Sequence, residues 1–375
     1  MTSLSRAPAA QAGVGADDGR SRLPAPRSDL FLREGYHSAQ VEVEVRLNTN
    51  ESPMPPPAAW REALAEEVAR IPFHRYPDRA ARELREALGT LHGVAPEQVF
   101  CANGSNEVLQ SLCLAYGGPG RTALTFEPTY ALHSHIAHLT NTDVVEAQRR
   151  DDFTLEPAAV RTALAQVRPD LCFLCSPNNP TGRADDPAVV EEVVAEAPGL
   201  VVVDEAYGQF ADWSALSLVE ADQPLVVTRT YSKTWSMAGV RLGYLIGPPA
   251  VVEVLERVAL PYHLDALKQA AGRLAVRFTG EMEHRVATIV AERGRLLDGL
   301  GRLGVTTWPS QANFILWRPA TDAGAVWRGL LQRSVLVRDC STWPRLAGCL
   351  RVTVGTATEN DRFLTALAEV LEELA

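Results

Sequence analysis

Lysine is almost absent from this chain. The 375 residues include 36 lysines and arginines, yet lysine stands only at positions 233 and 268. Because arginine supplies the positive charge elsewhere, a retained lysine suggests an amine that acts as a nucleophile. Arg241 follows Lys233 eight positions later, where a second cation would help to keep the amine unprotonated and could also grip a phosphate. A lysine in a surface loop explains the same spacing equally well.

Long apolar runs and an excess of positive charge are also missing. No apolar run reaches the about 18 residues that a membrane span requires, so we expect a soluble protein. A net charge of −10 argues against nucleic acid as the main partner, because phosphate neutralisation needs a basic face. The sequence has neither a GxGxxG motif after a first strand nor a GxxxxGK motif, so dinucleotide and nucleoside-triphosphate binding lack their signatures.

Cysteines are few and lie mostly within apolar runs. With six cysteines and no signal peptide, the sequence predicts reduced thiols in a cytoplasmic protein. Cys172 and Cys175 form a CxxC motif, but CFLCSP is typical of a buried strand and no second CxxC or ligand histidines accompany it. We therefore expect no metal site.

The alternation of apolar runs and helical patterns predicts an α/β protein. Short apolar runs occur at residues 122–126, 170–175, 199–204, 224–230 and 243–247. Helical patterns separate them, which indicates a mostly parallel sheet covered by helices on both faces. Further helical patterns cover residues 60–71 and 78–92.

The length of the chain exceeds what one hydrophobic core usually fills, which favours a large domain and a smaller one. After Pro261 the pattern changes to a long helical stretch over about 264–300, then to short strands and a terminal helix, as in an α+β domain. We expect a disordered leader over residues 1–28, an N-terminal arm over 29–55, a large domain over 56–260 and a small C-terminal domain over 261–375.

Polar residues directly after the apolar runs are the first candidates for a site, because ligands of open α/β sheets bind at the carboxyl ends of strands. Asp204 ends one run and could hold a protonated heterocyclic nitrogen, while Tyr207 could bond a neighbouring oxygen. Asn179, in SPNNPTG, could direct its amide at a ligand. The alternatives are structural: Asp204 could be a helix cap, and the Pro and Asn residues of SPNNPTG could form an ordinary turn.

Two further groups indicate anion binding. Ser105 and Asn106, in ANGSNE, follow a short strand and precede a helix, so their backbone amides would suit a phosphate. Arg338 and Arg351 stand in predicted strands of the second domain and could clamp anionic substrate groups. Two alternatives remain: Ser105 and Asn106 only begin a helix, and the two arginines are solvated or form structural pairs with other side chains.

The order of these motifs along the chain resembles that of the fold type I pyridoxal-phosphate aminotransferases. In more detail, the following motifs look like those of the histidinol-phosphate aminotransferase family: RLNTNESPMPPP, HRYPD, ANGSNE, SPNNPTG, VVDEAYGQF, SKTWSMAGVRLGYLIG, LPYHL and CLRVTVGT. The resemblance covers about residues 30–370. It implies transamination of histidinol phosphate and 2-oxoglutarate to imidazole acetol phosphate and glutamate.

The resemblance assigns roles around the cofactor ring. Lys233 would bind pyridoxal 5′-phosphate as a Schiff base, and Asp204 would pair with the pyridine nitrogen. Tyr207 and Asn179 would bond the phenolic oxygen of the cofactor, and Tyr130 would stack on its ring.

The resemblance also assigns residues to the phosphate and the substrate. The cofactor phosphate would be held by Ser105, Asn106, Thr230, Ser232 and Arg241, together with a tyrosine from the neighbouring subunit that matches Tyr76. This implies a homodimer with shared active sites. Arg351 would bind the substrate carboxylate, and the substrate would also contact Tyr36, Asn179 and Arg338.

One motif departs from the family pattern. Where the family has Asn-Glu-Asn-Pro and an aromatic residue, this chain has Ser52 and Met54 at the third and fifth positions, which could alter the substrate pocket. An aromatic amino-acid or biosynthetic tailoring aminotransferase and a phosphate-recognising decarboxylase keep the same cofactor residues. A non-catalytic regulator that binds the cofactor would need a nucleic-acid module, for which the leader lacks the length and a helix-turn-helix pattern.

Overall fold

The computed structural model describes residues 5–6, 27 and 39–375, so most of the expected leader lies outside the described residues. The central feature is a sheet in the order β1-β5-β4-β6-β7-β8-β9-β3. Its strands are β1 Ser5–Arg6, β3 Val99–Ala102, β4 Thr122–Glu127, β5 Asp143–Gln148, β6 Leu171–Cys175, β7 Leu200–Asp204, β8 Leu225–Thr230 and β9 Gly243–Ile246. Strands β4 to β8 run parallel, whereas β9 is antiparallel to both of its neighbours and β1 is antiparallel to β5. The prediction of a mostly parallel sheet is therefore confirmed.

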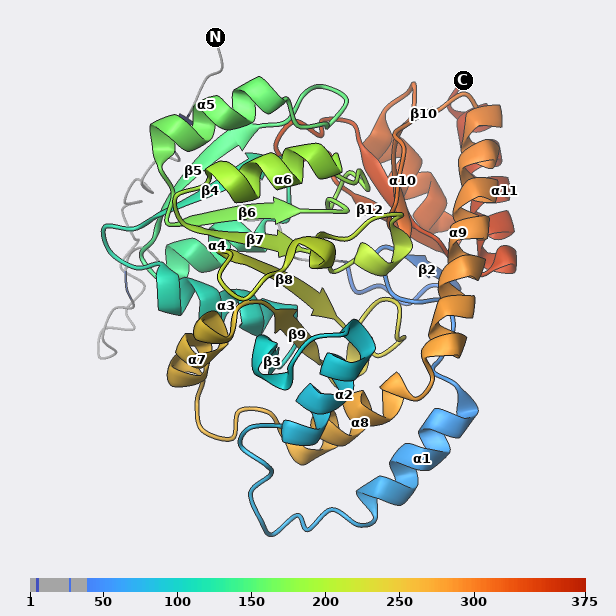
Figure 1. The fold of residues 1–375 in the computed structure, drawn as a ribbon. Coiled ribbons are helices and arrows are strands. Elements are labelled where there is room, and N and C mark those ends of the chain that lie inside the picture. The colour runs from blue at the N-terminus through green and yellow to red at the C-terminus, as the bar shows by residue number, and fades with distance from the viewer. Residues whose placement is uncertain (1–4, 7–26, 28–38) are drawn as a thin grey trace, which may run out of the picture.

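Helices cover both faces of this sheet (Figure 1). Helices α3 Ser105–Tyr116, α4 Leu132–Leu139 and α7 Pro249–Val258 pack on one face, and α5 Pro157–Val167 and α6 Pro187–Glu196 pack on the other. Successive strand residues point to opposite faces. In β7, for example, Val202 packs with the first group of helices, and Val201 and Val203 pack with the second. This double coverage explains why the strands appear as continuous apolar runs.

A buried ion pair joins the end of β5 to the segment before α6. The side chains of Arg149 and Asp185 are 0% and 1% exposed, and Arg149 Nη2 lies 3.0 Å from Asp185 Oδ2. Arg149 also donates to the backbone carbonyls of Phe126 and Phe153. Each charge is therefore compensated inside the protein.

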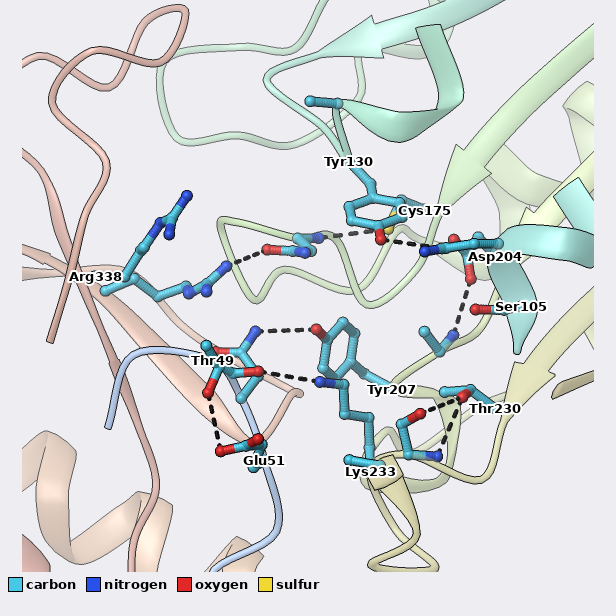
Figure 2. A pocket seen from close by; sticks show the side chains of 18 of the residues that line it. Thr49, Glu51, Ser105, Tyr130, Cys175, Asp204, Tyr207, Thr230, Lys233 and Arg338 are labelled. Carbon is cyan, nitrogen blue, oxygen red and sulfur yellow. Dashed lines mark hydrogen bonds between the residues drawn. The ribbon is translucent and has the colours of Figure 1, made fainter. Parts of the chain in front are cut away.

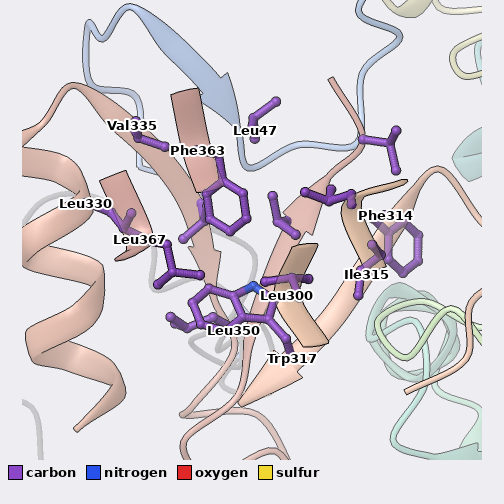
Figure 3. Close-up of a cluster of buried hydrophobic side chains, with 14 of the residues drawn as sticks. Leu47, Leu300, Phe314, Ile315, Trp317, Leu330, Val335, Leu350, Phe363 and Leu367 are labelled. Carbon is purple, nitrogen blue, oxygen red and sulfur yellow. The ribbon is translucent and has the colours of Figure 1, made fainter. Parts of the chain in front are cut away.

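A second sheet has the order β10-β11-β13-β12-β2. Its strands are β2 Val45–Leu47, β10 Thr306–Thr307, β11 Phe314–Arg318, β12 Val335–Asp339 and β13 Leu350–Thr353. Strand β2 comes from the N-terminal part of the chain and pairs in parallel with β12. The sheet packs on α9 Thr279–Arg302, α10 Ala323–Gln332 and α11 Ala357–Glu373. Figure 3 shows the resulting core, where Trp317, Phe314 and Phe363 are fully buried.

Four helices connect or flank the two sheets, and they differ in one respect from the expected pattern. Helices α1 Ala58–Val68 and α2 Arg82–His92 form where the sequence predicted helices. The long helical stretch after residue 264 is divided between α8 Ala266–Val276 and α9. Helix α8 packs against α1 and α2, whereas α9 leads to the second sheet. The proposed domain limits at residues 55 and 260 remain predictions.

Short 3₁₀ helices complete the described structure, namely η1 Pro96–Gln98, η2 Gly208–Phe210, η3 Ala215–Leu218 and η4 Ala238–Val240. Within the part of the chain that the structure describes, no helix is both long and apolar enough to cross a membrane.

Candidate active site

A cavity of about 380 Å³ lies where the carboxyl ends of β6, β7 and β8 face the second sheet (Figure 2). All but two of the predicted site residues line it, namely Ser105, Asn106, Tyr130, Asn179, Asp204, Tyr207, Thr230, Ser232, Lys233, Arg241, Arg338 and Arg351. Tyr76 does not line the cavity: it is 80% exposed and stacks on Tyr262 with ring centroids 4.5 Å apart. Tyr36 lies outside the described residues.

Lys233 stands in the loop that follows β8, and its side chain is half-buried in the cavity wall. Its Nζ donates a hydrogen bond to the carbonyl of Thr49 at 3.2 Å and lies 5.7 Å from the centroid of the Tyr207 ring. Burial lowers the pKa of Lys233 from 10.5 to about 7, the charge of Arg351 adds to this, and Glu51 opposes it. The amine is therefore available in its neutral form near neutral pH, as a nucleophilic lysine requires.

Asp204 ends β7 and is 1% exposed. Its Oδ1 accepts hydrogen bonds from the backbone N–H of Ala206 and from Thr228 Oγ1, each at 3.1 Å. Its Oδ2 lies 3.0 Å from His133 Nε2. The aspartate thus holds the turn after β7 and also lines the cavity. It is not a helix cap, because the following 3₁₀ helix η2 begins at Gly208 with Tyr207 in the N-cap position.

His133 is a site residue that the sequence analysis missed. Its ring is buried, stacks on Phe173 with centroids 5.0 Å apart, and meets the Tyr130 ring edge-on at 5.4 Å. Its Nδ1 is buried without a hydrogen-bond partner among the described residues. The histidine orients the carboxylate of Asp204 but is not itself part of the cavity lining. The only local signal is its position three residues after Tyr130.

Tyr207 and Asn179 connect the large sheet to the arm and to the second sheet. The Tyr207 hydroxyl accepts a hydrogen bond from Asn50 Nδ2 at 2.9 Å, a contact that the sequence analysis also missed. Asn179 Oδ1 accepts a hydrogen bond from Arg351, which also donates to the carbonyl of Asn48 at 3.2 Å. The remaining Nε of Arg351 is buried without a partner in the described structure. Arg351 therefore keeps one donor available beside the cavity.

The start of helix α3 and the loop after β8 form a cradle for an anion. Gly104 precedes the helix at a φ of +84°, and a Cβ there would lie 2.9 Å from Arg241 Nη2. A Cβ on Gly243 would lie 2.3 Å from the backbone nitrogen of Ser105. Glycine is needed at both positions because they bring Arg241 and β9 against the positive end of the helix dipole.

Two hydroxyls complete this cradle. Thr230 Oγ1 and Ser232 Oγ are 3.0 Å apart, and Arg241 Nη1 donates to Ser232 Oγ at 3.2 Å. Asn106, in the first turn of α3, accepts a hydrogen bond from the Tyr130 hydroxyl at 3.1 Å. Backbone amides, hydroxyls and one guanidinium thus converge, which is the donor set that a phosphate monoester requires.

The sequence model of the aminotransferase class I and II family matches residues 42–367. The chain belongs to this family. It is 46% identical over 381 residues to the histidinol-phosphate aminotransferase of Frankia casuarinae, a match that covers 96% of this chain and 95% of the relative. The corresponding enzyme of Mycobacterium avium is 45% identical, with 92% and 88% of the two chains covered.

A solved structure confirms the fold of this aminotransferase. The histidinol-phosphate aminotransferase of Sinorhizobium meliloti, in complex with pyridoxal-5′-phosphate, aligns with a TM-score of 0.81 at 24% identity over 89% of this chain and 92% of that chain. The expected fold type I architecture, the aminotransferase activity and the pyridoxal phosphate cofactor are confirmed.

The residues of this aminotransferase fit pyridoxal phosphate at three points. The cradle at Ser105 and Arg241 suits the phosphate, Lys233 supplies a neutral amine for the aldehyde, and Asp204 offers a buried carboxylate to the ring nitrogen. When bound, the cofactor supplies an electron sink for the bond that breaks at the substrate Cα. The protein supplies orientation, proton transfer and electrostatics.

The departures at Ser52 and Met54 lie beside the cavity and not in its described lining. Ser52 Oγ accepts a hydrogen bond from Ser236 Oγ at 2.7 Å, which ties the arm to the loop that carries Lys233. Met54 is partly buried against the core of the second sheet.

The CxxC motif is divided between two environments. Cys172 packs in the apolar core of the large sheet, whereas Cys175 lines the cavity and accepts a hydrogen bond from the Asn179 backbone N–H at 3.4 Å. Residues three apart on a strand point to opposite faces, so these two thiols do not share a site. Burial raises the pKa of the Cys172 thiol to about 12.

Proposed function

We propose that this aminotransferase acts on histidinol phosphate and uses 2-oxoglutarate as the amino acceptor. The products are imidazole acetol phosphate and glutamate. The relatives from Frankia and Mycobacterium, at 46% and 45% identity, carry the name of this activity. The observation that carries the proposal is a pair of arginines at the end of the cavity away from the cofactor cradle.

These two arginines lie side by side. Arg338 and Arg351 face each other in the register of β12 and β13, so both side chains leave the same face of the second sheet, and both line the cavity. Figure 2 shows Arg338 across the cavity from Asp204 and Ser105. Two adjacent guanidiniums suit a substrate phosphate in one half-reaction and the two carboxylates of 2-oxoglutarate in the other.

Within this site each residue has a stated task. Arg351 binds the α-carboxylate of the acceptor, and Arg338 binds the second anionic group. With its pKa of about 7, the Lys233 Nζ would also serve as the general base that takes the proton from the substrate Cα. Asp204 holds a proton on the ring nitrogen, and His133 keeps its carboxylate oriented at 3.0 Å.

The test is a comparison of amino donors with 2-oxoglutarate as acceptor. We expect turnover of histidinol phosphate to exceed that of phenylalanine and tyrosine. In the donor half-reaction alone, followed by cofactor absorbance in the absence of 2-oxoglutarate, Arg338→Ala should lose the rate with the phosphorylated donor and keep it with the others. Arg318→Ala is the matched control, because Arg318 is an exposed strand arginine outside the cavity lining. No turnover of histidinol phosphate, or equal losses with all donors, would contradict the proposal.

We further propose that the enzyme is a cytoplasmic homodimer in which Tyr76 reaches the phosphate cradle of the neighbouring subunit. Tyr76 lies in a region where large apolar side chains are exposed, namely Phe73 at 66%, Tyr76 at 80%, Leu260 at 76%, Tyr262 at 42% and Leu267 at 43%. Such a patch is typical of a subunit interface. Sedimentation equilibrium should give twice the chain mass, and Tyr76→Ala should weaken cofactor binding. A monomer with full cofactor affinity would contradict both points.

A further inference from the structure

The loop between β12 and β13 places one aromatic side chain at the substrate end of the cavity. The side chains that line the cavity include three aromatic ones, Tyr130, Tyr207 and Trp343. Tyr130 bonds Asn106 in the phosphate cradle, and Tyr207 lies beside Lys233. Trp343 stands apart from these two and beside the paired arginines. The function proposed above gives it no task.

The Trp343 ring contacts both arginines. Its centroid lies 5.3 Å from the guanidinium carbon of Arg338 and 5.9 Å from that of Arg351. Arg351 also lies 5.0 Å from the centroid of the Phe314 ring. The negative faces of aromatic rings attract guanidiniums, which helps two like charges to stand next to each other in the cavity.

The loop that carries Trp343 is anchored at both ends and in its middle. At its base the Cys340 N–H donates to the Cys349 carbonyl at 3.1 Å. Leu346 is buried in a small cluster that includes Phe153 from the large-sheet side of the molecule. Arg345 bonds the carboxylate of Asp151 at 2.8 Å. The tryptophan is therefore held in place, and its half-buried ring forms part of the cavity wall.

A donor whose anionic group reaches Arg338 brings the rest of its carbon skeleton into the part of the cavity that Trp343 lines. Charged and amide groups surround the rest of that end of the cavity, in particular Arg338, Arg351, Asn179 and the carbonyl of Asn48. An indole offers a flat apolar surface for another ring, in an offset or edge-on arrangement.

We propose that Trp343 is a specificity-determining residue that selects amino donors that carry a flat unsaturated ring in addition to the anionic group. The inference rests on the function proposed above, because it assumes that the donor anion binds at Arg338. It predicts that Trp343 lowers the KM of ring-bearing donors and has little effect on kcat or on donors that lack a ring.

The experiment uses the complete cofactor-bound enzyme and steady-state kinetics. Trp343→Leu removes the ring but keeps apolar bulk, and Trp343→Phe restores a ring. We expect Trp343→Leu to raise the KM for histidinol phosphate about five- to tenfold, as an aromatic pair is worth. The KM for the ring-free analogue 2-aminopropyl phosphate should remain within about twofold, and Trp343→Phe should recover most of the loss.

Trp308→Leu is the matched control. Trp308 packs on the same small cluster, where its ring lies 5.1 Å from that of Phe153, but it does not line the cavity. We expect this control to leave the ratio of the two donors unchanged. Circular dichroism and cofactor absorbance check that each variant is folded, and Trp343→Phe keeps the test valid if the leucine variant does not fold.

Three outcomes would overturn the inference. They are an unchanged KM for histidinol phosphate in Trp343→Leu, an equal rise for ring-bearing and ring-free donors, and the same change in Trp308→Leu. An equal rise would mean that Trp343 only positions the arginines. If the wild type does not use histidinol phosphate, the proposed function fails by itself. The same variants then test the inference with two other phosphorylated donors, 2-amino-3-phenylpropyl phosphate, which has a ring, and 2-aminopropyl phosphate, which has none.

Discussion

The rate at which the cofactor-free protein takes up pyridoxal phosphate should rise with pH and level off above about pH 7. The reason is that only the neutral amine of Lys233 attacks the aldehyde, and burial lowers its pKa to about 7. With this pKa about half of the amine is neutral at pH 7, whereas with the ordinary value only about one part in 3000 would be. Uptake near neutrality should therefore exceed that of an exposed lysine by about three orders of magnitude.

The assay is a stopped-flow measurement of cofactor absorbance after mixing with the apoprotein, repeated from about pH 5 to about pH 9. Butylamine serves as the control, because it reports the ionisation of the cofactor itself together with that of an unperturbed amine. The ratio of the protein rate to the butylamine rate should be constant below about pH 7 and fall about tenfold per unit above it, because the protein rate levels off while the neutral fraction of butylamine still rises. A protein rate that keeps rising tenfold per unit up to pH 9 would refute the account of Lys233.

Two charge variants test the cause of the shift in opposite directions. The positive charge of Arg351 lowers the pKa of Lys233, and the negative charge of Glu51 raises it. Arg351→Gln should therefore move the midpoint of uptake to higher pH, and Glu51→Gln should move it to lower pH, each by about one unit or less. Shifts in the same direction, or no shifts, would mean that burial alone sets the pKa.

Three further changes probe the catalytic lysine, the aspartate and the buried ion pair. Lys233→Arg should abolish turnover because a guanidinium does not deprotonate, while Lys268→Arg, at the other lysine of the chain, should retain it. Asp204→Asn keeps the side-chain shape but loses the charge opposite the ring nitrogen, and should lower kcat about a hundredfold or more with little change in urea midpoint. Asp185→Ala leaves the buried Arg149 uncompensated and should reduce the free energy of unfolding by about 3–5 kcal/mol in urea titrations.

For each of these three predictions, one result would contradict the reasoning behind it. Full turnover in Lys233→Arg would exclude Lys233 as the nucleophile. Loss of turnover in Lys268→Arg would mean that replacing either lysine inactivates the enzyme, and the comparison would no longer single out Lys233. An Asp204→Asn enzyme with wild-type kcat would show that the negative charge is not needed. Arg149→Met combined with Asp185→Ala should recover much of the lost stability, because it removes the unpaired charge. A double variant as unstable as the single one would place the loss elsewhere.

The strand ends of the large sheet could be predicted because its central strands are buried on both faces. Continuous apolar runs therefore mark them, and the residue that follows each run necessarily lies at the same edge of the sheet. Asp204 is the last residue of β7, and Lys233 lies three residues after the end of β8. Strand β5, which is partly exposed along its length, lacks such a run and gave no comparable signal.

The site residues that could not be predicted from the sequence depend on contacts between distant segments. His133 reaches Asp204 from a helix, and Asn50 reaches Tyr207 across 157 positions of sequence. Nothing in the local pattern of either residue differs from that of an ordinary helix or loop. The same holds for Trp343, whose role depends on the register that sets the two arginines side by side.

The pairing of β2 with β12 has a consequence for how the enzyme is made. Glu44, next to β2, bonds Ser334, next to β12, over 290 positions of sequence. The arm that supplies Thr49 and Glu51 to the cavity wall therefore has no strand partner until nearly the whole chain has been synthesised. A nascent chain that already contains Lys233 and its sheet is still without a complete binding site. A truncated chain that stops before β12 would lack Arg338 and Arg351 as well as the strand partner of β2, so it could complete neither the arm nor the substrate end of the cavity.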